Sequence, residues 1–570
     1  MKTDEKESTS RPAWWKEAVI YQIYPRSFRD SDGDGIGDLK GVVSKLDYVR
    51  SLGVDVIWLN PVFASPNDDN GYDISDYRAI MQDFGTMADF DRLLQEIHAR
   101  GMRLLLDLVV NHTSDEHPWF VQARNSRENP YYNYYVWWPA EHGAPPDRRS
   151  FFDERGDAWR YNPATDSYYL HYFSVRQPDL NWDNPEVRRE IYDMMNFWFA
   201  KGIDGFRLDS IPYISKEMTH PVIDERVYPG LFGFYSHGPR LHEYLHEMNR
   251  EVLSRYDCVS VGEGSGVEAS EAWKFVSAER QELDMLYGFG PSDVRNKTRP
   301  DSRRAGVSYS LVSLKRMFTD WDRGVRDGWP TVYLGNHDQP RMLSRFGSDR
   351  RPWREVSAKM LTTFLLTMRG TPCWYAGDEI GMANVRFSCI DHYNDIQTRN
   401  MYVRLEREGA DTRSFLREQK HTARDNARTP FQWDASPCAG FSSAAPWLRV
   451  NPDYRRVNAA AQQDDPDSVL NFFRRAVAFR KANKGLVYGD YTLLDEKNPQ
   501  TYTYLREGEG QRFLVALNFS RKPGRAFPAI SLDGAEKVLW NYPDTDPVYG
   551  TNASEGIPLR PFEAVVYRLS

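Results

Sequence analysis

The feature that most constrains the fold is a repeated alternation of short β-branched runs with amphipathic helical segments. Residues 54–59 and 103–110 are apolar, strand-like runs, and between them apolar residues recur at helical spacing from Phe90 to Ile97. Further strands are predicted at 205–209, 258–263 and 331–336. Alternation of this kind over several hundred residues predicts a parallel sheet, and strands that are apolar throughout predict burial on both faces.

The helix ends carry recognisable signals. Thr86 with Asp89 resembles a capping box, and Gly101 suits the C′ position of that helix. A second helix is predicted to begin at Asn184-Pro185, a cap residue followed by Pro at N1, and to stop at Gly202. Its inward-facing residues are Val187, Ile191, Met194, Met195 and Trp198.

Two stretches break the alternation. Residues 112–173 are aromatic, Pro-rich and too long for an ordinary βα loop, so we expect an inserted subdomain there. After a helix predicted at Pro466–Asn483, the pattern changes to period-two strands and predicts an all-β C-terminal domain. A chain of 570 residues exceeds what one core usually supports, which agrees with several domains.

Composition excludes some classes of function. The net charge of −8 disfavours nucleic acid and anionic membranes and favours an uncharged substrate. Residues 1–12 are polar and no run reaches 18 apolar residues, so we expect neither a signal peptide nor a membrane span. Four cysteines without CxxC spacing favour reduced thiols in a cytoplasm. The many aromatic residues suit stacking on sugar rings, but aromatic residues also fill protein cores. The sequence leaves the oligomeric state open.

Polar residues gather at the predicted strand ends, where barrel enzymes place their sites. Arg207 and Asp209 are two apart on one strand and share a face, so the cation favours an ionised carboxylate. Glu263 ends an apolar strand, and such a setting raises a carboxyl pKa and suits a proton donor. Any one of these acids could instead be a helix cap or an ion-pair partner. His112 and His337 lack metal-site spacing, so hydrogen bonding to an uncharged ligand is favoured over zinc.

A separate signal lies in the loop Asp30–Asp38. Carboxylates at its positions 1, 3, 5 and 9 and Gly at position 6 follow the EF-hand loop, although position 12 is Gly41 rather than Glu. The alternative is a polar turn that caps a helix from Asp38 to Leu52. We favour one structural Ca²⁺ ion.

Taken together, these segments resemble glycoside hydrolase family 13, the α-amylase family, and within it the oligo-1,6-glucosidase, α-glucosidase and sucrose isomerase group. The motifs appear in the family's order from about Trp14 to the C-terminus. They are QIYPRSF at 22–28, DLVVNH at 107–112, QPDLNW at 177–182, GFRLD at 205–209, VGE at 261–263, NHDQPR at 336–341 and RDNARTPFQW at 424–433.

The resemblance implies a (β/α)₈ TIM barrel with an inserted subdomain after strand 3 and a C-terminal antiparallel β-sandwich. The expected limits are 14–111 and 174–485 for the barrel, 112–173 for the insertion, 486–570 for the sandwich, and 1–13 for a flexible N-terminus.

The resemblance also assigns roles within a retaining α-glucosidase. It implies Asp209 as nucleophile, Glu263 as acid/base and Asp338 as the third carboxylate. The substrate-binding residues it implies are Asp69, Tyr72, His112, Phe173, Gln177, Arg207, His337 and Arg424. Closure by Asp69 and Arg424 implies an exo-acting pocket for di- or oligosaccharides. The implied Ca²⁺ ligands are Asp30, Asp32, Asp34, the Ile36 carbonyl and Asp38. No organic cofactor is implied.

The chain departs from the group near the leaving-group side. Ser210 follows the nucleophile where relatives carry Val, Ala or Thr, and both Gly264–Gly266 and Tyr287–Gly290 are poor in side chains. We therefore expect an unusual or broad aglycone preference. Two alternatives stay open: a transglycosylating sucrose isomerase or trehalose synthase-like enzyme, and, more remotely, a non-catalytic barrel that binds a ligand.

Overall fold

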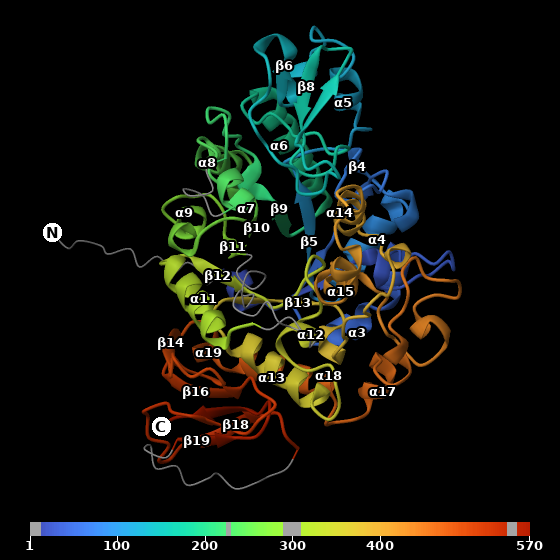
Figure 1. Ribbon diagram of the computed structural model, residues 1–570. Helices are drawn as coiled ribbons and strands as arrows, with labels where there is room; N and C mark the ends of the chain where they lie inside the picture. The colour runs from blue at the N-terminus through green and yellow to red at the C-terminus, as the bar shows by residue number, and fades with distance from the viewer. Residues whose placement is uncertain (1–12, 224–229, 289–308, 544–555) are drawn as a thin grey trace, which may run out of the picture.

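A closed barrel of eight parallel strands forms the centre of the computed structural model (Figure 1). The structure describes residues 13–223, 230–288, 309–543 and 556–570. In order around the barrel, the strands are β1 (Ile20–Ile23), β2 (Val56–Leu59), β5 (Arg103–Val109), β9 (Gly205–Asp209), β10 (Val259–Gly264), β11 (Met285–Gly288), β12 (Trp329–Val332) and β13 (Thr371–Tyr375). The predicted (β/α)₈ class is confirmed.

Helices cover the outside of the barrel (Figure 1). Among them are α1 (Trp14–Glu17), α2 (Leu39–Ser44), α3 (Leu46–Ser51), α4 (Met87–Ala99), α6 (Pro185–Lys201), α7 (Gly230–Tyr235), α8 (Leu241–Glu251) and α9 (Trp273–Val276). The later ones include α11 (Leu311–Gly324), α12 (Met342–Phe346), α13 (Arg354–Thr367), α16 (Asp425–Arg428), α17 (Ala459–Gln463), α18 (Val469–Ala482) and α19 (Lys484–Val487).

Alternate apolar residues of several barrel strands enter two different cores. On β2, Val56 and Trp58 belong to the core inside the barrel, whereas Ile57 and Leu59 belong to the core between strands and helices. Because successive strand side chains point to opposite faces, a strand buried on both faces must be apolar throughout. Burial on both faces therefore explains why these strands can be predicted from continuous apolar runs in the sequence.

The predicted helix ends match the structure. The side chain of Thr86 accepts from the Asp89 backbone, and the Asp89 side chain accepts from the Thr86 N–H, so α4 begins in a capping box. Helix α6 begins after Asn184, whose side chain accepts from the Glu186 N–H, and ends at Gly202 with φ 104°. That left-handed conformation favours glycine and stops the helix.

One predicted strand is shifted. The strand expected at 331–336 is β12, at Trp329–Val332, because its ladder with β13 ends at the pair Val332–Pro372. His337 and Asp338 therefore lie in the loop after the strand rather than at its end. A loop gives these side chains freedom of direction that a strand would not.

Two β-rich parts flank the barrel (Figure 1). After β5 the chain forms α5 (Pro118–Ala123) and a three-stranded sheet of order β6-β8-β7, made of Trp137–Pro139, Ser167–Leu170 and Trp159–Asn162. The C-terminal part contains an antiparallel sheet of order β14-β15-β16-β20-β18 and the pair β17-β19. Its strands are β14 (Asp490–Leu494), β15 (Thr501–Gly508), β16 (Gln511–Asn518), β17 (Gly524–Ala526), β18 (Glu536–Trp540), β19 (Ile557–Leu559) and β20 (Ala564–Arg568). The predicted N-terminal segment 1–13 lies outside the described residues except for its last residue.

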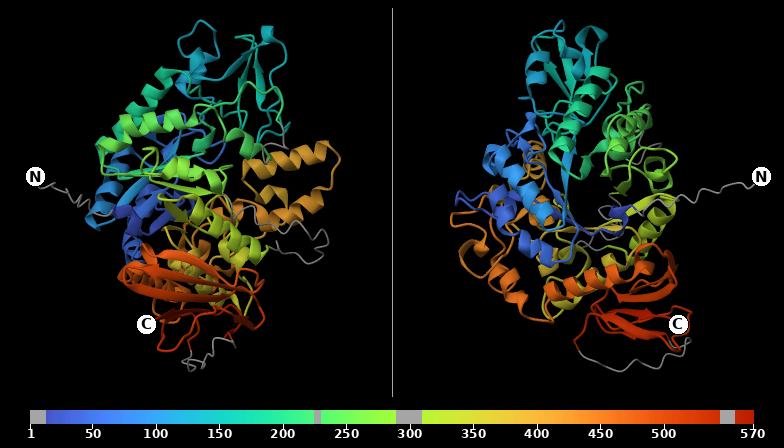
Figure 2. Two further views of the ribbon diagram at one scale, coloured as in Figure 1. Left: turned by 90° about the vertical axis from the view of Figure 1, so that its left-hand side faces the viewer. Right: turned by 180° about the vertical axis from the view of Figure 1, so that it is seen from behind.

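A helical hairpin after β13 reaches the inserted subdomain (Figure 2). It consists of α14 (Ile396–Arg407) and α15 (Thr412–Thr422). The Asn400 side chain donates to the Phe152 carbonyl at 2.9 Å, and Arg407 Nη2 lies 2.9 Å from Glu154 Oε1. Sequence segments about 250 residues apart thus meet over one edge of the barrel mouth. Within the described parts of the chain, no helix combines the length and apolarity needed to cross a membrane.

Candidate active site

Arg207 lies at the centre of a buried cluster of carboxylates. Strand register places it beside Asp107 on the neighbouring strand, and its Nη1 lies 2.6 Å from both Asp107 Oδ1 and Asp209 Oδ1. Its Nη2 contacts Glu263 Oε2, and its Nε donates to the Tyr287 hydroxyl at 2.8 Å. One guanidinium therefore holds the two acids that the sequence singled out, at the carboxyl ends of adjacent strands.

The carboxyl group of Glu263 is held on both oxygens. Ser265 donates to Oε1 at 2.8 Å, and the Ser210 backbone N–H donates to Oε2 at 3.3 Å. Burial raises the pKa of Glu263 to about 8, against the opposing charge of Arg207 and with a further contribution from Asp209. A carboxyl that stays protonated near neutral pH can donate a proton.

Ser210 adopts a left-handed backbone conformation with φ 43°. Such a conformation is uncommon for a residue with a side chain and clusters at functional sites. Here it turns the chain from β9 into the short helix at Ile211–Tyr213 and directs the Ser210 N–H toward Glu263. The residue after Asp209 therefore takes part in positioning Glu263.

Asp338 joins the cluster through His337 and Tyr72. His337 Nε2 lies 3.0 Å from Asp338 Oδ2 and 2.6 Å from the Tyr72 hydroxyl, which in turn donates to Asp107 Oδ2 at 2.9 Å. Burial opposes ionisation of Asp338, but His337, Arg424 and Arg428 hold its pKa well below the usual range. Asp338 and Glu263 are thus carboxyl groups with oppositely shifted pKa values in one site.

A second group of predicted residues extends the site toward the inserted subdomain. Gln177 Nε2 lies 3.2 Å from Asp69 Oδ2 and 3.1 Å from His112 Nε2, and the His112 and Phe173 rings are 5.0 Å apart. Burial lowers the pKa of His112 to about 4, so this ring is neutral at physiological pH. A neutral ring beside an amide suits hydrogen bonding to sugar hydroxyls.

Arg424 closes one end of the site. Its Nη1 lies 3.2 Å from Asp338 Oδ1, its Nη2 lies 3.3 Å from Asp69 Oδ1, and its Nε donates to Asp395 Oδ1 at 2.8 Å. The guanidinium also lies 4.7 Å from the ring centre of Phe152, from the inserted subdomain. All eleven predicted catalytic and substrate-binding residues therefore belong to one connected set.

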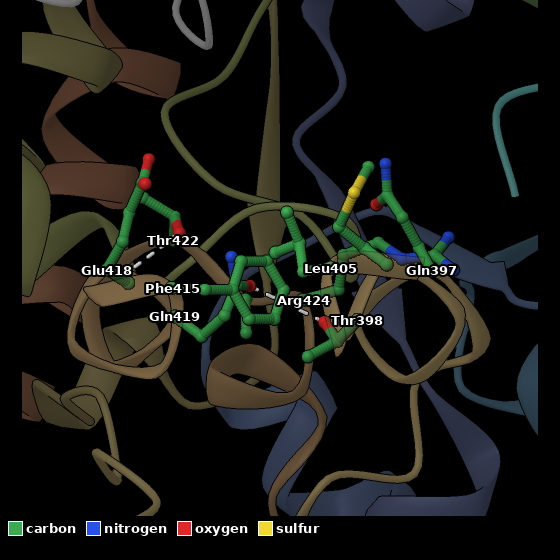
Figure 3. A pocket seen from close by; sticks show the side chains of 10 residues that line it. Gln397, Thr398, Leu405, Phe415, Glu418, Gln419, Thr422 and Arg424 are labelled. Carbon is green, nitrogen blue, oxygen red and sulfur yellow. Dashed lines mark hydrogen bonds between the residues drawn. The ribbon is translucent and has the colours of Figure 1, made fainter. Parts of the chain in front are cut away.

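The helical hairpin holds Arg424 from the other side. Thr398 donates to Asp395 Oδ2 at 2.6 Å, and Asp395 in turn accepts from Arg424. A pocket of about 330 Å³ lies between the two helices beside Arg424 (Figure 3). Its lining residues are Gln397, Thr398, Met401 and Leu405 of α14, Phe415, Glu418, Gln419 and Thr422 of α15, and Ala423 and Arg424.

The predicted calcium loop lies apart from this set. Carboxylate oxygens of Asp30, Asp32 and Asp38 all lie within 4.8 Å of one another, and Asp34 does not belong to that group. The Asp34 side chain instead accepts from the Ile36 N–H at 2.7 Å. Asp38 caps α2 by accepting from the Gly41 N–H, as the capping alternative predicted.

Sequence reasoning missed several residues of the site. Asp107 lies in the DLVVNH motif without a predicted role, although an aspartate inside an otherwise apolar strand indicates a buried, paired carboxylate. Arg428 lies four residues after Arg424 and donates to Asp338 Oδ1 at 2.9 Å, and helical spacing could have indicated it. Ser265 and Tyr287 lie in the two side-chain-poor segments that the resemblance relates to the leaving group, but neither residue had a predicted role, and no sequence signal indicated Asp395.

Known proteins resemble this chain over most of its length. The family described as "Alpha amylase, catalytic domain" matches residues 22–489. Oligo-1,6-glucosidase of Parageobacillus thermoglucosidasius is 49% identical over 563 residues, covering 98% of this chain and 99% of that protein. The enzyme of the same name from Bacillus cereus is 48% identical, with the same coverage. The structure of trehalulose synthase from Pseudomonas mesoacidophila MX-45 superposes with a TM-score of 0.92 at 42% identity, covering 98% of this chain and 100% of that one.

Proposed function

Because this chain belongs to the α-amylase family and is a glycoside hydrolase of the α-glucosidase type, we propose that it releases glucose from short α-glucosides by a retaining double displacement. The observation that carries the proposal is that Arg207 contacts both Asp209 and Glu263 in a site closed by Arg424. The raised pKa of Glu263 keeps this carboxyl protonated near neutral pH. Retaining enzymes need a nucleophile and an acid/base that face each other across the glycosidic bond.

In the first step, Asp209 attacks the anomeric carbon while Glu263 gives its proton to the leaving oxygen. The glycosidic bond breaks, the aglycone departs as an alcohol, and a covalent glycosyl-enzyme remains. Ionised Glu263 then takes a proton from water, whose oxygen attacks the same carbon and displaces Asp209. Two inversions release glucose with its α configuration retained.

Exo action follows from the closed end of the site. Arg424 joins Asp69 to Asp338, so a sugar bound against Asp338 has no space for a further residue beyond its non-reducing end. His112, Gln177 and His337 would hold the hydroxyls of that sugar, and Tyr72 and Phe173 would flank it. Short substrates with one glucose at the non-reducing end fit such a pocket.

The linkage preference rests on residues of the leaving-group side. The curated relatives named above are oligo-1,6-glucosidases, which favours α-1,6 linkages. Ser210 and Gly264–Gly266 carry small side chains or none, and this supports a broader aglycone range. Residues 289–290 of the side-chain-poor segment 287–290 lie outside the described residues.

One incubation series tests the proposal. Isomaltose, maltose, sucrose, trehalose and kojibiose are each incubated with the protein and the products are separated by chromatography. Free glucose, initially as the α anomer by NMR, supports retaining hydrolysis and ranks the linkages. A new disaccharide with little free glucose would instead indicate an isomerase; the structural relative named above is a trehalulose synthase. No turnover would contradict both.

A structural calcium ion is part of the proposal. Asp30, Asp32 and Asp38 would hold it, because three carboxylates that lie so close repel one another without a cation. Burial and, after it, the charges of Asp34, Asp38 and Asp30 raise the pKa of Asp32, whereas hydrogen bonds from Ser442, Gly33 and Gly35 lower the pKa of Asp30 against the effect of burial. The loop is tied to a distant segment by the Asp30 N–H bond to the Phe441 carbonyl, 3.1 Å.

We also propose a cytoplasmic location. All four cysteines lie in described residues and none is paired, which is typical of a reducing compartment.

A further inference from the structure

A row of aromatic rings leads from the sugar-binding residues to the surface. The rings of Phe173 and Phe151 are 5.4 Å apart, and those of Phe151 and Phe232 are 4.6 Å apart at an interplanar angle of 18°. Phe173 itself lies 5.0 Å from His112. The row starts at the expected glucose position and ends at Phe232, which is 50% exposed.

Phe232 lies on the side where the leaving group departs. It belongs to α7, and a Cβ on Gly266 would come within 2.1 Å of the Phe232 carbonyl oxygen, so α7 packs directly on the loop after Glu263. Ser236 of the adjoining turn donates to the Gly266 carbonyl at 3.0 Å. Because Glu263 protonates the leaving oxygen, the aglycone must pass this loop, and Gly266 permits the close approach of α7.

The opposite end of the site is blocked. Arg424 pairs with Asp69 and Asp338 there, so a substrate longer than one sugar extends only past Glu263. A single exposed aromatic ring on a protein surface carries little information. Phe232 differs because Phe151 supports it nearly in parallel and the row continues into the site.

We propose that Phe232, supported by Phe151, is an aglycone-specificity residue that stacks on the flat apolar face of the leaving group. This inference rests on the proposed glucosidase function and names the chemistry of its aglycone: a planar, apolar face such as an aryl ring or the CH face of a second sugar. Aromatic rings gain from such stacking beyond simple burial of area. The Phe232 side chain is half exposed and therefore accessible to such a group.

The test compares substrates with and without an aglycone. Phe232→Ala is assayed on p-nitrophenyl α-glucoside, on isomaltose and on α-glucosyl fluoride, whose leaving group is a single atom. We expect the ratio of kcat/KM for the aryl glucoside or isomaltose to that for the fluoride to fall about two- to tenfold, the size of one stacking contact. The loss should lie mainly in KM, and Phe232→Trp should restore the ratio.

Phe527 supplies the matched control. It is a phenylalanine of similar exposure, 47%, in the C-terminal part of the chain, and Phe527→Ala should leave the ratio unchanged. A ratio unchanged in Phe232→Ala overturns the inference while the glucosidase function stands. Equal losses on all three substrates also overturn it, since they indicate a structural role. Failure of the unmodified protein to hydrolyse even the fluoride overturns the proposed function and this inference with it.

Discussion

The hydroxyl of Ser265 lies 2.8 Å from Oε1 of Glu263 and donates a hydrogen bond to it. The contact joins the acid/base to a residue only two positions along the chain, in a loop of small residues. A hydroxyl that donates to a carboxylate stabilises the ionised form and lowers its pKa. Ser265 therefore counteracts the effect of burial on Glu263.

The first prediction concerns pH dependence. Glu263 must carry its proton when the first step begins, and burial raises its pKa to about 8. We expect kcat/KM for isomaltose to fall as pH rises through about 8, because the proton donor is then lost. A pH profile of the free enzyme measures this limb. A basic limb below pH 6 would contradict the assignment.

Replacing Ser265 should move the same limb. In Ser265→Ala the ionised carboxylate loses a donor, so the pKa of Glu263 rises and the basic limb shifts upward by roughly half to one unit. Ser265→Thr should restore the original profile. Ser260, also on β10, donates to Asp284 at 2.9 Å and serves as control, since Ser260→Ala should not move the limb. An unchanged profile in Ser265→Ala would show that the contact does not tune Glu263.

The two catalytic carboxyls should respond differently to the leaving group. Glu263→Gln should lower kcat/KM for isomaltose by about 10²–10⁴, the range for loss of a general acid. It should affect α-glucosyl fluoride far less, because fluoride departs without a proton. Asp209→Asn should abolish turnover of both substrates, since no covalent bond can form. Equal losses of both substrates in Glu263→Gln would contradict its role as proton donor.

Arg424 should matter for stability as well as for binding. Arg424→Met leaves Asp69 without its ion-pair partner and leaves Asp338 and Asp395 with Arg428 alone, and breaking a buried ion pair costs about 3–5 kcal/mol. We expect a lower Tm and a higher KM. Arg407, on the hairpin that precedes Arg424, is the control, because its pair with Glu154 is exposed and is worth about 0–1 kcal/mol. If Arg407→Met lowers Tm as much as Arg424→Met, the hairpin rather than the site explains the loss.

The calcium proposal predicts a metal-dependent Tm. Removal of Ca²⁺ with a chelator should lower Tm. Ca²⁺ at a hundredfold excess over its Kd should raise the free energy of unfolding again by about 2.7 kcal/mol. Asp32→Asn should weaken this response. Asp34 lies outside the close group of carboxylates, so Asp34→Asn should retain more of it. Calorimetry with and without Ca²⁺ measures both variants, and a Tm indifferent to chelator would contradict the proposal.

Local chemistry explains what the sequence alone could determine. Some features depend only on neighbouring residues and can be predicted from the sequence alone. They are the alternation of buried strands with amphipathic helices, the capping box at Thr86 and the helix end at Gly202. Motifs at the ends of several strands likewise indicated Arg207, Asp209 and Glu263, because parallel strands bring their carboxyl ends to one edge.

Only the tertiary structure decided which side chains meet and with what effect. Arg207 contacts Asp107 and Glu263 from positions 100 and 56 residues apart, and Arg424 reaches Asp69 across 355 residues. No local pattern encodes such distances. The fold also set the opposite pKa shifts of two carboxyls: burial raises the pKa of Glu263, whereas His337, Arg424 and Arg428 lower that of Asp338 against the effect of burial. Desolvation and these neighbouring charges exist only once the chain has folded.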